Sequence, residues 1–546
     1  MKPLSQRHHS FLYIGIAASG FLVFSGLGIA FIRASGPTYD EPVHLATGYT
    51  DIVDGRYRLN ARDHPPFGEM WASLPLLGMR LQSFRQSADW LRGRDQYNYA
   101  DLFLYRNNVP AGRLLNASRI WTLVTWGALL TLGLTEWSSR LWGIPGAAWA
   151  MLFFAFSPPL ISNASLVTTD IPAAALYFAT FWILSRRPRK TAAWAAAGIA
   201  MGLALASKFS MPVLPLAALI CLLSECQQRA ERPSWRSWLL MGAVALFIVA
   251  AIYRFRYLPL YFDGLAATSR RINEGRSSFL WGSYSTTGSL LYFPLALLIK
   301  TPLPALAFAA LGLALWLRAP DTEGLWLIFP AFAYFIPALF SKTQIGYRHI
   351  LPVYPFLVLW AAHGGAWLWR RAWPWRAAAA ALAAWLITGV LRAAPYQLAY
   401  FNELAGGPAG GYRFLADSNL DWGQDLKALA ADLRRLGNPP VLLVYFGVGD
   451  PGYYGIHYLP MGVVTNVDSS RRRGDTPLDY PWRYIAVSET NLQGVYYANK
   501  KAFAWLKDLK PIARPGWSIF LYDLKGHPEA RKKLAAMLGL AGKKTG

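Results

Sequence analysis

The chain has little charge and almost no cysteine. Only 15% of its 546 residues are charged, whereas 54% are hydrophobic. Soluble domains carry about 25% charged residues, so the shortfall excludes an ordinary soluble protein and favours a chain that a bilayer solvates in part. The two cysteines, Cys221 and Cys226, fall on one expected helix. A disulfide framework or a cysteine metal site is therefore not expected.

Signatures of nucleotide and nucleic-acid binding are also lacking. The glycine-rich stretch at 447–452 does not have the spacing of a phosphate-binding fingerprint. The net charge is +24, yet neither a basic face nor a nucleic-acid motif accompanies it. We therefore expect no nucleic-acid partner.

What the sequence does contain is a series of apolar runs of about 20 residues, the length of a helix that crosses a bilayer. We interpret the first run as a retained helix, because no clear small-residue cleavage site follows it. The sequence predicts a polytopic α-helical membrane protein with about eleven transmembrane helices, at 11–33, 114–136, 145–162, 171–185, 192–207, 210–224, 237–257, 290–317, 324–341, 350–369 and 376–392.

Positive charge gathers in short loops between these runs, as it does on the cytoplasmic side of membrane proteins. This pattern predicts an inside N-terminus in the inner membrane of a bacterium, with membrane lipids as partners. The basic clusters are Arg186, Arg187, Arg189 and Lys190; Arg229, Arg232 and Arg236; and Arg370, Arg371 and Arg376. The segments expected outside are 34–113, 162–170, 207–210, 258–289, 341–349 and everything after about 393.

The C-terminal part differs in composition from the rest. Helix-like and strand-like patterns alternate there, which is typical of a small α/β domain. Helices are expected at 422–436 and 502–509, and strands at 441–446, 484–487 and 517–521. We therefore divide the chain into a transmembrane domain at 1–392, with a long first external loop at 34–113, and an extracytoplasmic α/β domain at 393–546.

An acidic motif stands directly after the first apolar run. Residues 38–44 read Thr-Tyr-Asp-Glu-Pro-Val-His, and the proline suits the first turn of a helix. On that helix Asp40 and His44 share a face, and a carboxylate there can act as a general base. A solvated helix start is the alternative interpretation, since Asp40 and Glu41 also favour helix N-termini.

Two further polar clusters are expected on the same side of the membrane. Asp63 and His64 precede two prolines in the first loop, and Asp170 begins the fourth apolar run. A carboxylate at the edge of hydrocarbon is costly and marks a functional candidate, although a helix cap also explains a lone Asp170. Three such clusters on one face favour a functional site.

With these motifs the chain resembles the GT-C superfamily of membrane glycosyltransferases. The similarity extends over the first loop and the apolar body, and it is greatest to protein O-mannosyltransferases and to aminoarabinose transferases acting on lipid A, grouped as glycosyltransferase family 39. The lipid A enzymes have Glu-Lys-Pro-Pro where this chain has Asp-His-Pro-Pro at 63–66. Other similar segments are 292–302, 346–352 and 417–425.

The resemblance implies a GT-C-like fold and an inverting transfer of a sugar from a polyprenyl-phosphate donor to a protein or glycolipid acceptor. Asp40 would be the general base, with Glu41 and Asp170 as further catalytic candidates. Arg348 is the first choice for the leaving phosphate, because its forked donors suit phosphate and the departing group gains negative charge. The other candidates for substrate binding are His44, Asp63, His64, Lys208, Lys300, Lys342 and His349.

Three matters stay open at this stage. A divalent metal is possible on oxygen and imidazole ligands, with Glu41, His44, Asp63 and His64 as candidates, and no other cofactor is expected. Acceptor contacts are expected at Asp421, Trp422 and Gln424, where an ordinary helix start is an equal alternative. The main alternative function is a lipid or glycolipid flippase, which would need ionisable residues through the membrane midplane and repeated halves, neither of which is evident.

Overall fold

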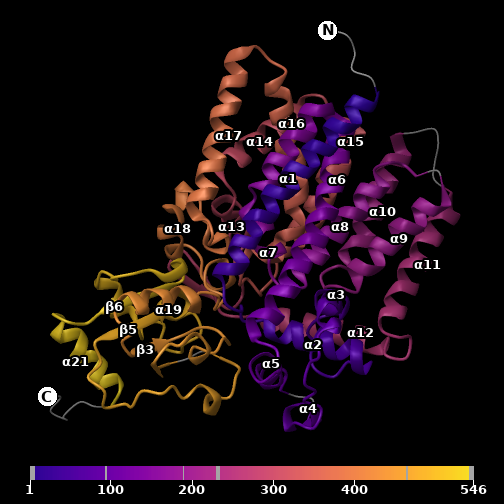
Figure 1. The fold of residues 1–546 in the computed structure, drawn as a ribbon. Helices are drawn as coiled ribbons and strands as arrows, with labels where there is room; N and C mark the ends of the chain where they lie inside the picture. The colour runs from indigo at the N-terminus through magenta and orange to yellow at the C-terminus, as the bar shows by residue number, and fades with distance from the viewer. Residues whose placement is uncertain (1–5, 93–94, 189, 229–233, 463–464, 540–546) are drawn as a thin grey trace.

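The structure is a computed structural model that describes residues 6–92, 95–188, 190–228, 234–462 and 465–539. Three arginines of the basic clusters, Arg189, Arg229 and Arg232, lie outside these residues. Figure 1 shows a helical bundle with the chain's N-terminus at one end and the C-terminal region packed at the other. The bundle helices are α1 (Gln6–Ala34), α6 (Ala111–Ala155), α7 (Pro158–Ala164), α8 (Asp170–Leu184), α9 (Thr191–Leu205), α10 (Val213–Gln228), α11 (Trp235–Ile252), α13 (Tyr292–Lys300), α14 (Leu303–Arg318), α15 (Thr322–Leu339), α16 (Tyr354–Trp369) and α17 (Trp373–Ala393).

The bundle makes the protein a multi-pass integral membrane protein. Within the described residues, five helices are long and apolar enough to cross a membrane, or seven if each of two bent pairs forms one span. Three shorter apolar helices, α8, α9 and part of α10, lie beside them. Helix α16 is buried in the middle of the bundle, whereas α1, α11 and α17 expose most of their apolar surface, as helices in contact with lipid do.

Helix α6 is too long for one crossing and consists of two antiparallel segments. Gly143 has φ 66° and ψ −158°, which breaks the helix. A Cβ atom on Gly146 would lie 2.6 Å from the carbonyl oxygen of Ser138, whereas those residues would be about 12 Å apart along a continuous helix. The chain therefore reverses at Gly143, between the spans predicted at 114–136 and 145–162.

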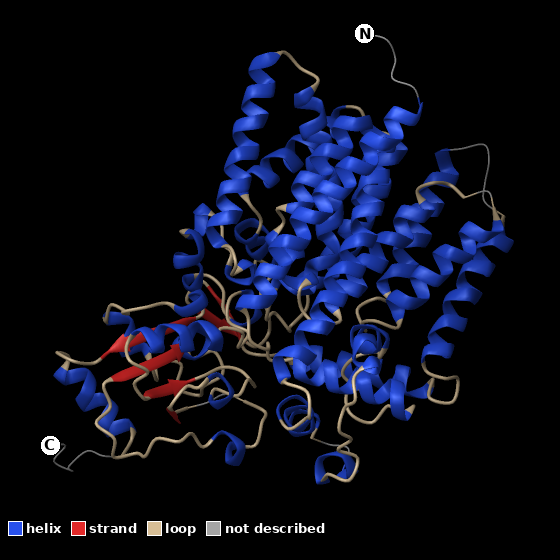
Figure 2. Ribbon diagram, viewed as in Figure 1, coloured by secondary structure: helices blue, strands red, loops and turns tan. Residues whose placement is uncertain are grey.

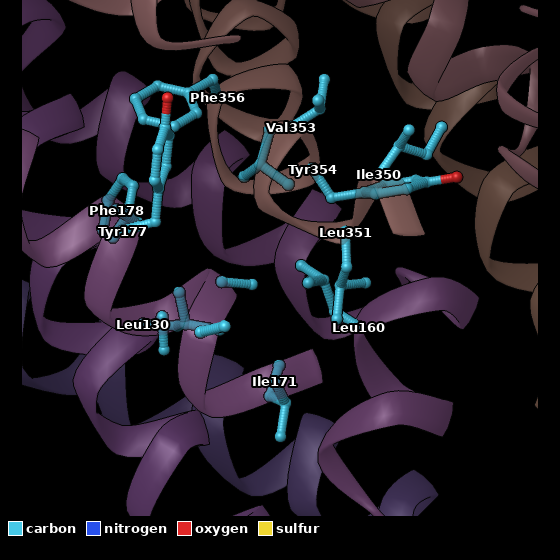
Figure 3. Close-up of a cluster of buried hydrophobic side chains, with 14 of the residues drawn as sticks. Leu130, Leu160, Ile171, Tyr177, Phe178, Ile350, Leu351, Val353, Tyr354 and Phe356 are labelled. Carbon is cyan, nitrogen blue, oxygen red and sulfur yellow. The ribbon is translucent and has the colours of Figure 1, made fainter. Parts of the chain in front are cut away.

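The functional residues lie where α8 meets the start of α16. Figure 3 shows Tyr177 and Phe178 of α8 facing Phe356 of α16, with ring centroids 6.2 and 5.7 Å from that of Phe356. This aromatic contact holds α8 against η2 (Tyr347–Val353), the short helix that leads into α16. It thereby fixes Asp170 relative to Arg348.

The predicted external loops are largely structured. The segment at 34–113 contains α2 (Glu41–Asp54), α3 (Phe67–Ser73), η1 (Leu74–Gly78), α4 (Ala88–Arg92) and α5 (Gln96–Tyr105). The segment at 258–289 contains α12 (Pro259–Glu274) and a hairpin of β1 (Ser278–Leu280) and β2 (Ser283–Ser285). Figure 1 shows α2, α3, α5 and α12 at the end of the bundle that carries the C-terminal region.

The C-terminal region forms a small mixed sheet with apolar cores on both faces. Its order is β4-β3-β5-β6, with β3 parallel to β4 and β5 and β6 antiparallel to β5; Figure 2 shows these strands gathered at one end of the molecule. Alternate side chains of β3 face α19 on one side and α21 on the other. The elements are α18 (Gly407–Gly410), α19 (Leu426–Arg435), β3 (Val441–Val444), β4 (Tyr458–Pro460), β5 (Tyr484–Ser488), α20 (Glu489–Leu492), β6 (Ile519–Asp523) and α21 (Pro528–Met537).

The sequence predictions for this region were right about three strands and wrong in two details. The helix expected at 422–436 begins only at Leu426, because residues 417–425 leave the helical path to pack against the bundle. The helix expected at 502–509 is a short 3₁₀ turn, Ala504–Asp508. Strand β4 was not predicted, since its three residues are too few for a recognisable alternation.

Two glycines allow α14 and α16 to pack in direct backbone contact. A Cβ atom on Gly364 would lie 2.2 Å from the carbonyl oxygen of Phe308, and one on Gly312 would lie 2.1 Å from that of Trp360. Small residues at such crossings let transmembrane helices approach closely.

We predict that Gly364→Val separates these helices and lowers the free energy of unfolding by about 3 kcal/mol, the upper part of the range for overpacking. Thermal unfolding of purified protein in detergent would measure the change. Gly26→Val is the matched control, because a Cβ atom there meets nothing within 4 Å. An equal loss in both variants would contradict the assigned contact.

Candidate active site

Arg348 stands at the centre of the candidate site. It lies on η2 and is 9% exposed. Its Nη1 atom is 3.3 Å from Asp40 Oδ2 and 3.4 Å from Asp170 Oδ2. Its guanidinium carbon lies 4.1 Å from the ring centroid of Trp422, and its Nε donates a hydrogen bond of 3.1 Å to Ser418 Oγ. Three segments far apart in the sequence therefore meet on one side chain.

The two carboxylates beside Arg348 differ in accessibility. The Asp170 side chain is 1% exposed and also forms an ion pair with Lys208 Nζ. The Asp40 side chain is 24% exposed and accepts no hydrogen bond from the helix that it begins. Asp170 can therefore hold the cations, whereas Asp40 is the carboxylate that an incoming substrate can reach.

Glu41 does not point into this site, contrary to its expected catalytic role. Its side chain is fully buried and paired with Arg119 of α6, whose Nε lies 2.7 Å from Glu41 Oε1. It also accepts hydrogen bonds from the backbone of Thr38 and Val167, each of 2.9 Å. Since Arg119 donates to the carbonyl oxygens at 35 and 36, the pair joins the first loop to α6. We therefore assign Glu41 a structural role.

The histidines of the first loop form a buried polar layer beside the site. His44 Nδ1 lies 2.7 Å from Glu69 Oε1. Burial alone would lower the pKa of His44, but the contact with Glu69 has the larger effect and raises it. His64 packs edge-on against His44, with ring centroids 5.0 Å apart, and its Nδ1 lies 3.2 Å from Thr169 Oγ1. Burial and the neighbouring His44 and Lys208 lower the pKa of His64 well below its usual range, so His64 is neutral at pH 7.

Three of the predicted substrate-binding residues have partners other than Arg348 and its carboxylates. Asp63 forms an ion pair with Arg271 of α12. Lys300 is buried and donates to the carbonyl oxygens of Leu398 and Asn419, at 2.8 and 2.6 Å. Lys342 donates to the carbonyl oxygen of Asn273 at 3.1 Å. The lysines therefore tie chain segments together, which corrects their assignment to substrate. His349, next to Arg348, has a buried Nε2 without a hydrogen-bond partner among the described residues.

The segment expected to contact the acceptor is mostly internal. Gln424 is buried and bonds to the backbone of Trp422 and Leu420. Asp421 is buried and accepts from the backbone nitrogen of Thr490 at 2.9 Å, and burial raises its pKa to about 7. Neither side chain is positioned to meet an acceptor. Trp422 is equally buried, and its ring packs against the guanidinium group of Arg348.

A second arginine beside Asp40 was not found from the sequence. Arg276 follows α12, and its guanidinium carbon lies 4.9 Å from the ring centroid of Tyr496. Tyr496 in turn donates a hydrogen bond to Asp417. Desolvation opposes the charge of Arg276, but Tyr496, Asp417 and Asp40 together raise its pKa. No motif surrounds Arg276, so only its spatial neighbours reveal it.

The predicted metal ligands do not converge. Glu41 is paired with Arg119, Asp63 with Arg271 and His44 with Glu69. Among the residues that the structure describes, no group of three or more histidine, cysteine or acidic side chains is placed to hold a metal ion. The described side chains therefore do not fit the metal site considered from the sequence.

Comparison with known proteins supports the membrane-glycosyltransferase interpretation. The family model described as dolichyl-phosphate-mannose-protein mannosyltransferase matches residues 114–253. The fold is similar to that of ArnT from Cupriavidus metallidurans, solved bound to undecaprenyl phosphate, with a TM-score of 0.50, 16% identity and coverage of 95% of this chain and 98% of that one. It is also similar to the apo oligosaccharyltransferase of Archaeoglobus fulgidus, with a TM-score of 0.51, 11% identity and coverage of 90% and 71%. No curated protein sequence matches.

The chain has the fold of solved membrane glycosyltransferases of the GT-C class, in agreement with the resemblance noted in the sequence. Within that fold class, residues 114–253 match the mannosyltransferase family model. At these identities the two solved structures are similar to the chain in fold alone.

We predict that Glu41→Ala lowers the free energy of unfolding by about 3–5 kcal/mol, because it leaves Arg119 buried without its counter-charge. Thermal unfolding in detergent would measure the loss. Glu274→Ala, at an exposed carboxylate that ends α12, is the control and should change stability by less than about 0.5 kcal/mol. A Glu41 variant that keeps full stability would refute the structural role.

Proposed function

We propose that the protein transfers a sugar from a polyprenyl-phosphate donor to an acceptor at the outer face of a bacterial inner membrane. The observation that carries the proposal is the shared contact of Asp40 and Asp170 with one nitrogen of Arg348. It supplies an accessible base and a fixed cation within one site. The family match supports the reaction class, and the undecaprenyl phosphate bound to ArnT supports the donor.

The reaction would be a single displacement with inversion. Asp40 takes the proton of the acceptor hydroxyl as the hydroxyl oxygen bonds to the anomeric carbon. The bond from that carbon to the phosphate oxygen breaks, and polyprenyl phosphate leaves with the bonding electrons. The transition state has oxocarbenium character, and the charge on the leaving phosphate is met by Arg348, with Lys208 and Arg276 nearby. Neutral His64 would accept a hydrogen bond from the sugar or the acceptor.

The membrane topology of this proposal follows the charge distribution. With α6 divided at Gly143, we assign the apolar segments of the bundle to the eleven spans predicted from the sequence, although five to seven helices of the described residues are long and apolar enough to cross by themselves. We place the N-terminus inside and the residues after 393, as an extracytoplasmic domain, outside together with Asp40. The acceptor is a protein hydroxyl or a glycolipid. The flippase alternative gains no support, because the ionisable groups around Arg348 gather at one end of the bundle.

We predict that Asp40→Asn lowers kcat/KM by about 10²–10⁴-fold, the usual contribution of a general base, without lowering the melting temperature. The assay would follow label from polyprenyl-phosphate sugars into the protein and lipid fractions of membrane extract. Asp63→Asn is the matched control, since Asp63 is another partly exposed carboxylate of the first loop but pairs with Arg271. Full activity of Asp40→Asn would remove the assigned base.

We predict that Arg348→Lys raises the KM for the donor by about tenfold, because lysine keeps the charge but loses the planar fork and the stacking on Trp422. Arg276→Gln should have a smaller effect in the same direction. Initial rates at varied donor concentration would separate KM from kcat. Arg271→Lys serves as control, and an unchanged KM in Arg348→Lys would place the phosphate elsewhere.

A further inference from the structure

A large cavity lies in the bundle, far from Arg348. Its volume is about 630 Å³, within the range of about 300–1,000 Å³ typical of ligand sites. It is bordered by the turn of α6, the end of α8, the α14–α15 connection and α16. His363, which lines it, follows Arg348 by fifteen residues along η2 and α16, or about 22 Å. The cavity is therefore at the end of the bundle opposite the proposed reaction.

Four charged side chains line this cavity, and two of them, Arg187 and Glu323, pair with each other. Arg140 donates hydrogen bonds to the carbonyl oxygen and the hydroxyl of Ser185, at 2.8 and 2.7 Å, which are neutral partners. Asp321 accepts from the backbone nitrogen of Gly324 at 2.8 Å, at the start of α15. In the part of the chain that the structure describes, neither forms an ion pair. A ligand that carries both charges would complement them.

Aromatic faces line the space between these two charges. Trp142 stacks on His363, with ring centroids 4.8 Å apart and an interplanar angle of 9°. Trp316 packs against Trp360 at 5.7 Å, and its Nε1 donates to the carbonyl oxygen of Asp321 at 3.1 Å. Tryptophan faces next to a carboxylate favour an ammonium group through cation–π attraction. Tryptophan is also the residue that membrane proteins place at the headgroup level.

We propose that this cavity binds the zwitterionic headgroup of an aminophospholipid, with the phosphate on Arg140 and the ammonium group between Asp321 and the tryptophan faces. Arginine suits phosphate because its donors are planar and forked. The neighbouring leucines of the lining, Leu141, Leu315 and Leu327, are apolar contacts for the start of the acyl chains. The site is independent of the proposed reaction, since none of its residues contacts Arg348.

Native mass spectrometry of the purified, delipidated protein would test the site. We expect phosphatidylethanolamine to be retained about tenfold more strongly than phosphatidylglycerol, which has the phosphate but no ammonium group. A tenfold difference in affinity corresponds to about one charge-assisted hydrogen bond. Asp321→Asn should remove this preference, whereas Arg140→Gln should weaken the retention of both lipids, since both carry the phosphate. Asparagine remains a good helix cap, so Asp321→Asn tests the charge while α15 keeps its start.

The controls distinguish a built site from a general attraction. Arg318→Gln removes an exposed arginine at the end of α14, outside the cavity lining, and should leave the preference unchanged. Soluble phosphoethanolamine separates the two possible sources of the headgroup: competition at equal concentration would indicate a free metabolite instead of a lipid. Equal retention of the two lipids, or unchanged retention of both lipids in Arg140→Gln with an unchanged melting temperature, would overturn the proposal.

Discussion

The arrangement of the active site depends on one guanidinium group held between two carboxylates. Arg348 contacts Asp40 and Asp170 through the same nitrogen and stacks on Trp422. A buried cation is unfavourable unless it is paired, so the bundle, the first loop and the C-terminal region must all supply partners at this point. The result is a cation already in position for a phosphate, with only Asp40 left accessible.

The surrounding structure keeps these partners in place. The buried pair of Glu41 and Arg119 holds the first loop on α6, so that Asp40, the residue before Glu41, faces Arg348. Lys300 ties α13 to the carbonyl oxygens of Leu398 and Asn419, and thereby supports the segment that carries Trp422. Charged residues far from the reaction thus act on it through geometry.

The C-terminal region is part of the site and not only an appended domain. Ser418, Trp422 and Tyr496 all lie after residue 393, yet they contact Arg348 or Arg276. Because we propose that these arginines bind the donor phosphate, we expect that a movement of the C-terminal region would alter donor binding. The cavity at the opposite end has a different chemistry, with aromatic faces and charges of both signs in its lining.

The sequence by itself determined the membrane class, the apolar segments and three C-terminal strands, because apolar length and alternation are local properties. It also named Asp40, Asp170 and Arg348, which the fold brings together, as candidates. Only the tertiary structure separated Asp40 from its neighbour Glu41, whose side chain meets Arg119. It likewise paired Lys300 with backbone carbonyl oxygens and brought Arg276 close to Asp417 and Tyr496. The partner of a charged side chain can come from a segment far away in the sequence, so a local sequence pattern does not predict it.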